Sequence, residues 1–201
     1  MIFNFTKNYQ FTTKLAHNED AVEIIDETKL LGTIITDDLK WHKNTESLVK
    51  RAYARMRILH KISEFSAPVE DMVIIYISYI RSLLEQSCSV WHSGLTVENC
   101  EDLERVQKSA LRIILKDDYK SYEQALETLM LARLSERREQ MCLKFAKNCV
   151  KNDLTSDLFP LNTAESIGTR NKEKYRVLHA NTGRLKDSAV PYLQRLLNAN
   201  Q

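Results

Sequence analysis

The chain has 201 residues, carries a formal net charge of +2 and is 43% hydrophobic. A sequence of this length and composition can bury a hydrophobic core, which excludes a wholly disordered protein. The nearly balanced charge requires neither a nucleic acid nor an anionic membrane as partner, so such an argument must rest on where the charges lie.

The sequence contains few residues that interrupt helices, with four glycines and three prolines. Such a sequence, rich in Leu, Lys, Glu and Arg, favours long helices. We therefore predict an α+β fold that is predominantly α, with a small N-terminal β segment followed by a helical bundle. The predicted parts are a β segment over residues 1–37, a helical bundle over 38–152 and a C-terminal extension over 153–201.

The first part of the chain is predicted to be β because it contains short runs rich in β-branched and aromatic residues. Polar residues separate these runs, with turns expected at Asn18-Glu19-Asp20 and at Asp26-Glu27. The expected strands cover residues 2–5, 11–15, 21–25 and 29–35.

From Asp38 onward the hydrophobic period changes from about two residues to about 3.6, which indicates helices. A first helix is expected over 43–63, with Asn44 or Thr45 as its N-cap. A second helix is expected over 68–90. It is apolar nearly all round, which is typical of a helix buried centrally.

Further helices follow, each opened by a residue that favours a helix N-terminus. Thr96 opens a helix that reaches residue 115, and a capping-box pattern at Ser121 opens one that reaches residue 130. The next begins at Ser135 and is expected to bury Met141, Phe145 and Cys149. Beyond it we expect a loop over 153–174, a short strand over 175–179 and a final helix over 188–198.

Motifs for catalysis or cofactor binding are not found in the sequence. Its glycines stand alone, so neither a P-loop nor a Rossmann phosphate-binding turn is present. The cysteines form no C-x-x-C pair, and no histidine begins the His-x-Asp pattern of a facial triad. We therefore predict no enzymatic activity, no cofactor, no metal and no small-molecule substrate. The cysteines are Cys88, Cys100, Cys142 and Cys149.

Two acidic pairs, Asp37-Asp38 and Asp117-Asp118, could hold Mg²⁺, but their positions at a helix start and in a turn favour structural roles. No signal peptide or membrane span is predicted, because the longest apolar run is interrupted by Ser78, Arg81 and Ser82. We expect an intracellular protein, in the cytoplasm or nucleus, with no membrane partner.

The first predicted helix carries a stripe of basic residues opposite its apolar side. Lys43, Lys50, Arg57 and Lys61 lie on this stripe, and Arg51 and Arg55 flank the core side. Such a stripe can follow a phosphate backbone, and Trp41 at its start could stack on a base. A row of charges is also typical of an ordinary solvated helix surface, so both interpretations stay open. The predicted nucleic-acid contacts are Trp41, Lys43, Lys50, Arg51, Arg55, Arg57 and Lys61.

Five motifs follow one another along the chain: KLLGTIITDDLKW with the basic helix after it, YIRSLLEQSCSVWHSGL, LERVQKSALRIIL, YEQALETLMLARLSERRE and TRNKEKYRV with GRLKDSAVPYLQRLLN. In this order they resemble the region that follows the catalytic palm in reverse transcriptases of non-LTR (LINE-like) retrotransposons. Cys88 departs from the family, which tends to have an aromatic residue there.

The resemblance implies that residues 1–37 are strands of a palm edge and that the helices form a thumb and a post-thumb region. The family's thumb grips the template–primer duplex through its backbone, which makes Lys43, Lys50, Arg57 and Lys61 candidates for duplex contact. The family's catalytic Phe/Tyr-Ala-Asp-Asp hairpin would precede Met1. The resemblance therefore implies a non-catalytic fragment that retains binding to an RNA/DNA duplex.

Residues 30–56 also resemble the N-terminal segment of an AlkB-homologue tRNA-modification protein, an Fe(II)/2-oxoglutarate oxygenase fused to a methyltransferase. Neither iron ligands nor a methyl-donor glycine loop accompany this segment. Two alternative hypotheses thus stand beside duplex binding: a protein of that oxygenase and methyltransferase kind, and an inactive relic with no role.

Overall fold

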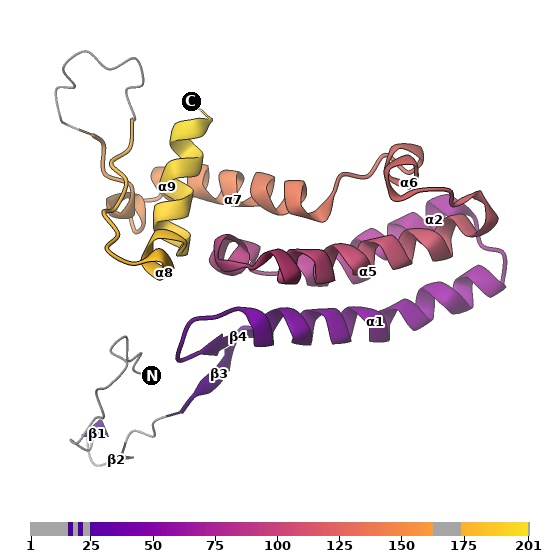
Figure 1. Ribbon diagram of the computed structural model, residues 1–201, viewed down its shortest axis with the longest axis horizontal. Helices are drawn as coiled ribbons and strands as arrows, with labels where there is room; N and C mark the ends of the chain where they lie inside the picture. The colour runs from indigo at the N-terminus through magenta and orange to yellow at the C-terminus, as the bar shows by residue number, and fades with distance from the viewer. Residues whose placement is uncertain (1–15, 18–19, 22–24, 163–173, 201) are drawn as a thin grey trace.

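The computed structural model describes residues 16–17, 20–21, 25–162 and 174–200. These residues are mostly helical, with a small antiparallel hairpin directly before the first long helix (Figure 1). The predicted fold class is confirmed. The strands expected over 2–5 and 11–15 lie outside the described residues.

Two short antiparallel pairs form the β part of the structure. In the first, β1 (Ala16–His17) pairs with β2 (Asp20–Ala21). In the second, β3 (Glu27–Leu30) pairs with β4 (Thr33–Thr36), and Leu30 lies opposite Thr33.

The single strand expected over 29–35 is wrong, because the chain reverses direction inside it. Leu31 and Gly32 both have positive φ values, 47° and 86°, as the two central residues of a tight hairpin turn require. Glycine adopts this conformation readily, and it makes the Leu-Gly pair a turn. The turn expected at Asp26-Glu27 is also wrong, since Glu27 begins β3.

The first long helix, α1 (His42–Glu64), agrees closely with the sequence, but its expected cap is wrong. Trp41 is the N-cap residue and provides no side-chain cap, while Asn44 and Thr45 are buried in the first turn. The Asn44 Oδ1 atom instead accepts a hydrogen bond from the backbone N–H of Ile34 at 3.1 Å. This bond ties the hairpin to the start of α1.

The helix expected over 68–90 is divided into consecutive pieces. Its π-helical middle contains an extra residue per turn. Ser87, with φ at 54°, interrupts the helix after Gln86. The prediction that this helix is buried nearly all round is also wrong, because Ile74 is 61% exposed. The pieces are α2 (Val69–Ile75), π-helical η1 (Tyr76–Arg81), α3 (Ser82–Glu85), α4 (Cys88–Trp91) and the 3₁₀ turn η2 (His92–Gly94).

The helices expected after Thr96 and Ser121 begin where these capping residues predict, whereas α7 begins at Leu134, with Arg133 and not Ser135 as the residue before it. The Thr96 hydroxyl accepts a hydrogen bond from Asn99 N, and the Ser121 hydroxyl accepts one from Gln124 N, both at 3.2 Å. The strand expected over 175–179 is wrong, since Tyr175 makes an isolated bridge. These elements are α5 (Val97–Leu115), η3 (Lys116–Asp118), α6 (Tyr122–Thr128), α7 (Leu134–Lys151), η4 (Ser156–Leu158), α8 (Gly183–Lys186) and α9 (Ala189–Ala199).

The buried side of α7 is rotated by about one residue position, roughly 100°, from the side that the sequence predicts. Met141 and Phe145 are 37% and 45% exposed, although Cys149 is buried as expected. The pattern misleads because Arg138 occupies an inner position where a hydrophobic residue would be expected. The buried positions are Leu134, Arg138, Cys142, Ala146 and Cys149.

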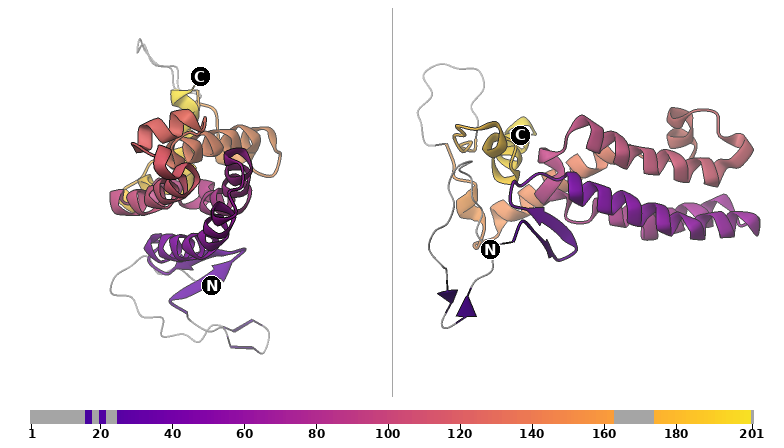
Figure 2. Two further views of the ribbon diagram at one scale, coloured as in Figure 1. Left: turned by 90° about the vertical axis from the view of Figure 1, so that its right-hand side faces the viewer. Right: turned by 60° about the horizontal axis from the view of Figure 1, so that its bottom comes forward.

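The long helices lie along one axis, and α9 crosses them near one end (Figures 1 and 2). α1 and α5 run parallel: Asn99 Nδ2 lies 3.1 Å from His42 Nδ1 at their starts, and Lys116 Nζ donates to Ser63 O at their ends. α7 runs in the opposite direction to α5: Leu134 N at its start donates to Glu104, and Arg138, one turn later, contacts Cys100, one turn earlier on α5.

A buried amide connects three segments of this bundle. Gln107 on α5 is fully buried, and its Oε1 atom accepts a hydrogen bond from the Tyr76 hydroxyl. Its Nε2 atom donates to the Tyr122 hydroxyl at 2.9 Å and to the Ala132 carbonyl at 3.0 Å. Because each polar atom of the amide has a partner, its burial favours a single arrangement of the helices.

A second buried polar side chain in the core, that of Arg138, lacks the hydrogen-bond partners that Gln107 has. The Arg138 guanidinium is fully buried, and among the described residues no nitrogen or oxygen atom accepts a hydrogen bond from it. It contacts the thiol of Cys100, a weak acceptor, and lies 6.0 Å from the Trp91 ring. Burial lowers the pKa of His92 to about 4, and the positive charge of Arg138 adds to this effect.

Acid should destabilise the protein through His92, which folding keeps neutral. Unfolding lets this imidazole take up a proton, so the free energy of unfolding should decrease as the pH falls from 6.5 towards 4. We expect a loss of about 2 kcal/mol over this range. Urea denaturation at pH 7.0 and 4.5 measures it.

The His92→Gln variant should lose less stability over this pH range than the unmodified protein. His60 is exposed on α1, so His60→Gln serves as the matched control and should retain the full pH dependence. An equal loss in both variants would contradict the assignment to His92.

Candidate nucleic-acid interface

Three basic side chains form a row on the outer face of α1. Lys50, Arg57 and Lys61 are exposed and lie seven and four residues apart. At about 100° per residue these spacings place them within roughly 40° around the helix axis and over about 16 Å along it. The residues on the opposite side, including Leu48 and Leu59, are buried in the core. We call Lys50, Arg57 and Lys61 the α1 row.

No member of the α1 row takes part in an ion pair within residues 25–162 and 174–200. Two exposed glutamates, Glu46 and Glu64, border the row on the same side of α1 and reduce its net positive charge. Arg57 makes one local hydrogen bond, from Nε to the Ala54 carbonyl at 3.3 Å. The three positive charges are therefore available to a partner.

Lys43 lies on the same side of α1, but its charge is already matched. Its Nζ atom lies 2.6 Å from a carboxylate oxygen of Glu27 on β3. This hydrogen bond and the negative charge of Glu27 raise the pKa of Lys43. Lys43 thus connects the hairpin to α1, and its contribution to an anion-binding surface is smaller than sequence reasoning suggests.

Arg55 and Arg51 lie on the flank of α1 that meets η1, and both make contacts within the protein. The Arg55 guanidinium lies 4.5 Å from the centre of the Tyr79 ring and donates to the Tyr79 carbonyl. Arg51 is half-buried and donates to the Ser47 carbonyl at 3.3 Å. Burial lowers its pKa, and repulsion from Arg55 adds to this.

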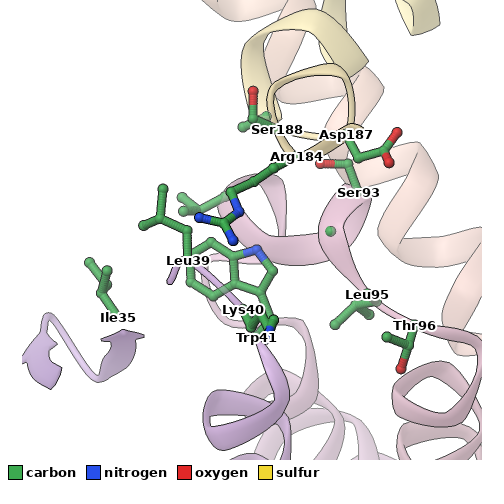
Figure 3. Close-up of a pocket in the computed structure, with 13 residues that line it drawn as sticks. Ile35, Leu39, Lys40, Trp41, Ser93, Leu95, Thr96, Arg184, Asp187 and Ser188 are labelled. Atoms are coloured by element: carbon green, nitrogen blue, oxygen red, sulfur yellow. The ribbon is translucent and has the colours of Figure 1, made fainter. Parts of the chain in front are cut away.

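Trp41 is separated from the α1 row. It precedes α1 and lines a cavity between the start of that helix, η2 and the turn that joins α8 to α9 (Figure 3). Trp41 is the N-cap residue and lies outside the helix that carries the row. The structure therefore does not bring this indole to the cations with which the sequence grouped it.

Sequence reasoning missed a second set of exposed cations on α7. Lys144, Lys147 and Lys151 follow one another at three- and four-residue spacing, and all are exposed. Within the described part of the chain they form no ion pairs. The regular spacing was the signal that could have revealed this α7 row.

The motifs that resemble reverse transcriptases contribute mainly to the interior. Glu85 on α3 accepts a hydrogen bond from Arg137 Nε at 2.6 Å and lies 3.6 Å from Arg81 Nε. Glu104 on α5 accepts from the Tyr122 hydroxyl and from Leu134 N. These residues of the quoted motifs therefore join helices to one another.

The acidic pairs have local roles. Burial alone would raise the pKa of Asp38, but hydrogen bonds from the Thr36 hydroxyl and from Lys40 lower it to about 2. Asp117 and Asp118 are exposed in η3. Among the described residues, no group of three or more His, Cys, Asp or Glu side chains could hold a metal ion. No helix in the described ranges is long and apolar enough to span a membrane.

No family model, curated protein or solved structure matches this chain at a significant level. The similarities to the reverse transcriptase and to the oxygenase and methyltransferase protein thus rest on the motifs quoted above.

The two kinds of cation on α1 should differ in their effect on stability. Arg55→Ala removes a guanidinium stacked on Tyr79 and its hydrogen bond, so the free energy of unfolding should decrease by about 1–2 kcal/mol. Lys50→Ala removes an exposed, unpaired ammonium and should change it by less than about 0.5 kcal/mol. Urea denaturation of both variants checks this, and equal losses would contradict the distinction.

Proposed function

We propose that this chain is a non-catalytic fragment, related to the C-terminal part of a non-LTR retrotransposon reverse transcriptase, that binds an RNA/DNA duplex through its phosphate backbone. The observation that carries the proposal is the α1 row: three exposed cations on one helix that form no ion pair in the described ranges.

The arrangement of the α1 row supports an anionic partner. Arg57 and Lys61 are four residues apart, and like charges at this spacing destabilise a helix by about 0.2–0.5 kcal/mol. A phosphate group near both would turn this repulsion into attraction. Tyr53 and Ile58, which are 40% and 42% exposed, add contact surface on either side of the row.

The length of the row also suits a duplex. Its extent of about 16 Å corresponds to the axial rise of about five base pairs, at about 3.4 Å per pair. Side chains on a straight helix can contact backbone phosphates in this way without reading base edges, so binding should depend little on sequence.

Duplex binding should depend strongly on salt. Three phosphate contacts imply a slope of log K against log salt near −2.7, which is roughly a 40-fold loss of affinity between 50 and 200 mM salt. We expect this dependence for a 20-base-pair RNA–DNA hybrid, measured by fluorescence anisotropy with the full chain. Equal affinity at both salt concentrations would overturn the phosphate-contact proposal.

Charge reversal tests whether the α1 row makes these contacts. The variant K50E/R57E/K61E should lose at least 10-fold in affinity and most of the salt dependence. The matched control is K144E/K147E/K151E, which changes the net charge by the same amount on α7 and should keep the affinity within about threefold.

Equal weakening by both variants would show a general attraction to positive charge and would contradict the assignment to α1. Unchanged binding by the α1 variant would also overturn it. Absence of duplex binding in the unmodified chain would instead favour an inactive relic. Circular dichroism on each variant verifies that the fold is retained.

A further inference from the structure

A cavity of about 580 Å³ lies beside the start of α1, where η2 and the α8–α9 turn approach it (Figure 3). Its volume falls within the range of typical small-ligand sites, about 300–1,000 Å³. Most of its wall is apolar and comes from separate parts of the chain, including Ile35 on β4, Val90 on α4 and Leu95. Such a wall favours a ligand with an apolar body.

Trp41 supplies an aromatic surface to this cavity. A Cβ atom on Gly94 would lie 2.7 Å from both Cδ1 and Nε1 of the indole, so the ring packs directly on the η2 backbone. Only glycine permits this approach. Trp41 is half-buried, and no hydrogen bond from its indole N–H is found among the described residues. The ring is thus held in place against the η2 backbone.

Arg184 supplies a positive charge at the same cavity. The other cation on the wall, Lys40, pairs with Asp38 at 3.1 Å, whereas Arg184 forms no ion pair within the described segments. In Figure 3 the Arg184 side chain extends towards the indole, and the Asp187 carboxylate points away from it. The cavity therefore offers an apolar space, an aromatic ring and a guanidinium that is free to bind an anion.

We propose that this cavity binds a flat aromatic ligand that carries an anionic group, of the class of a nucleoside monophosphate. The aromatic ring of the ligand lies against Trp41 and the apolar wall, and its phosphate pairs with Arg184. The proposal is independent of duplex binding, because no residue of the α1 row lines the cavity.

Fluorescence of the full chain tests the proposal, with AMP as the probe. The sequence has two tryptophans. Trp91 is fully buried and donates to the Gln86 carbonyl, so a ligand in the cavity should quench Trp41 selectively. We expect saturable quenching with a Kd on the order of 0.1–1 mM. Adenosine, which lacks the anion, should bind at least 10-fold more weakly, and inorganic phosphate alone should not quench.

Variants assign the binding to the cavity. Arg184→Gln should weaken AMP binding at least 10-fold, whereas Lys186→Gln, on the same short helix but outside the cavity wall, should leave it unchanged. Gly94→Ala should also weaken binding, because the added methyl group displaces the indole. The K50E/R57E/K61E variant should still bind AMP, which separates this site from the duplex surface.

Two results would overturn the proposal. One is the absence of saturable Trp41 quenching in the unmodified chain, measured with Trp91→Phe to remove the second indole. The other is equal AMP binding by Arg184→Gln and Lys186→Gln, since an anion held in this cavity must respond to the guanidinium beside it.

Discussion

The buried amide of Gln107 is the interaction on which the arrangement of the bundle depends. A fully buried amide is tolerated only when its donors and acceptor find partners, and the partners here come from η1, α6 and the segment before α7. Glu104, one turn earlier on α5, accepts hydrogen bonds from Tyr122 and Leu134. Sliding any of these segments by one residue would leave buried polar atoms without partners, so the network sets the register that apolar packing alone leaves loose.

Several residues of the motifs that resemble reverse transcriptases lie in this interior. Arg81, Glu85 and Arg137 form a charged cluster between α3 and α7, and Gln107 lies within the LERVQK motif. These residues specify how helices pack. The α1 row, by contrast, contributes nothing to packing, because its side chains project outward from a helix whose other side carries the core. Duplex binding is thus a separate hypothesis from the sequence resemblance.

Gln107 is a buried polar side chain whose atoms all have hydrogen-bond partners, whereas Arg138 is a buried cation that lacks them. Its guanidinium is buried without a nitrogen or oxygen acceptor in the described part of the chain, and its positive potential acts on the groups around it. It opposes the effect of burial on the Cys100 thiol, whose pKa is nonetheless raised, and it helps to keep His92 neutral. A hydrogen bond from the Cys142 thiol lowers the pKa of Cys88, with Arg138 adding to the effect. The buried positive charge of Arg138 therefore lowers the pKa values of Cys88, His92 and Cys100 relative to what their surroundings would otherwise give.

The sequence by itself determined the helical class, the positions of α1, α5 and α6, and the caps at Thr96 and Ser121, because these features depend on local periodicity and on side chains that bond their own backbone. It also placed Lys50, Arg57 and Lys61 on one exposed face, since helix geometry alone decides that. It could not place the Leu31–Gly32 turn, the interruption at Ser87 or the rotation of α7.

Only the tertiary structure decided which of the predicted contact residues remain available. Lys43 pairs with Glu27, Arg55 stacks on Tyr79, and Trp41 faces a cavity that is completed by residues 90–96 and 184–189. Each of these outcomes depends on a partner distant in sequence, and a periodic pattern carries no information about such partners. The cavity between Trp41, Gly94 and Arg184 exists for the same reason: three separate segments must fold together before it has walls.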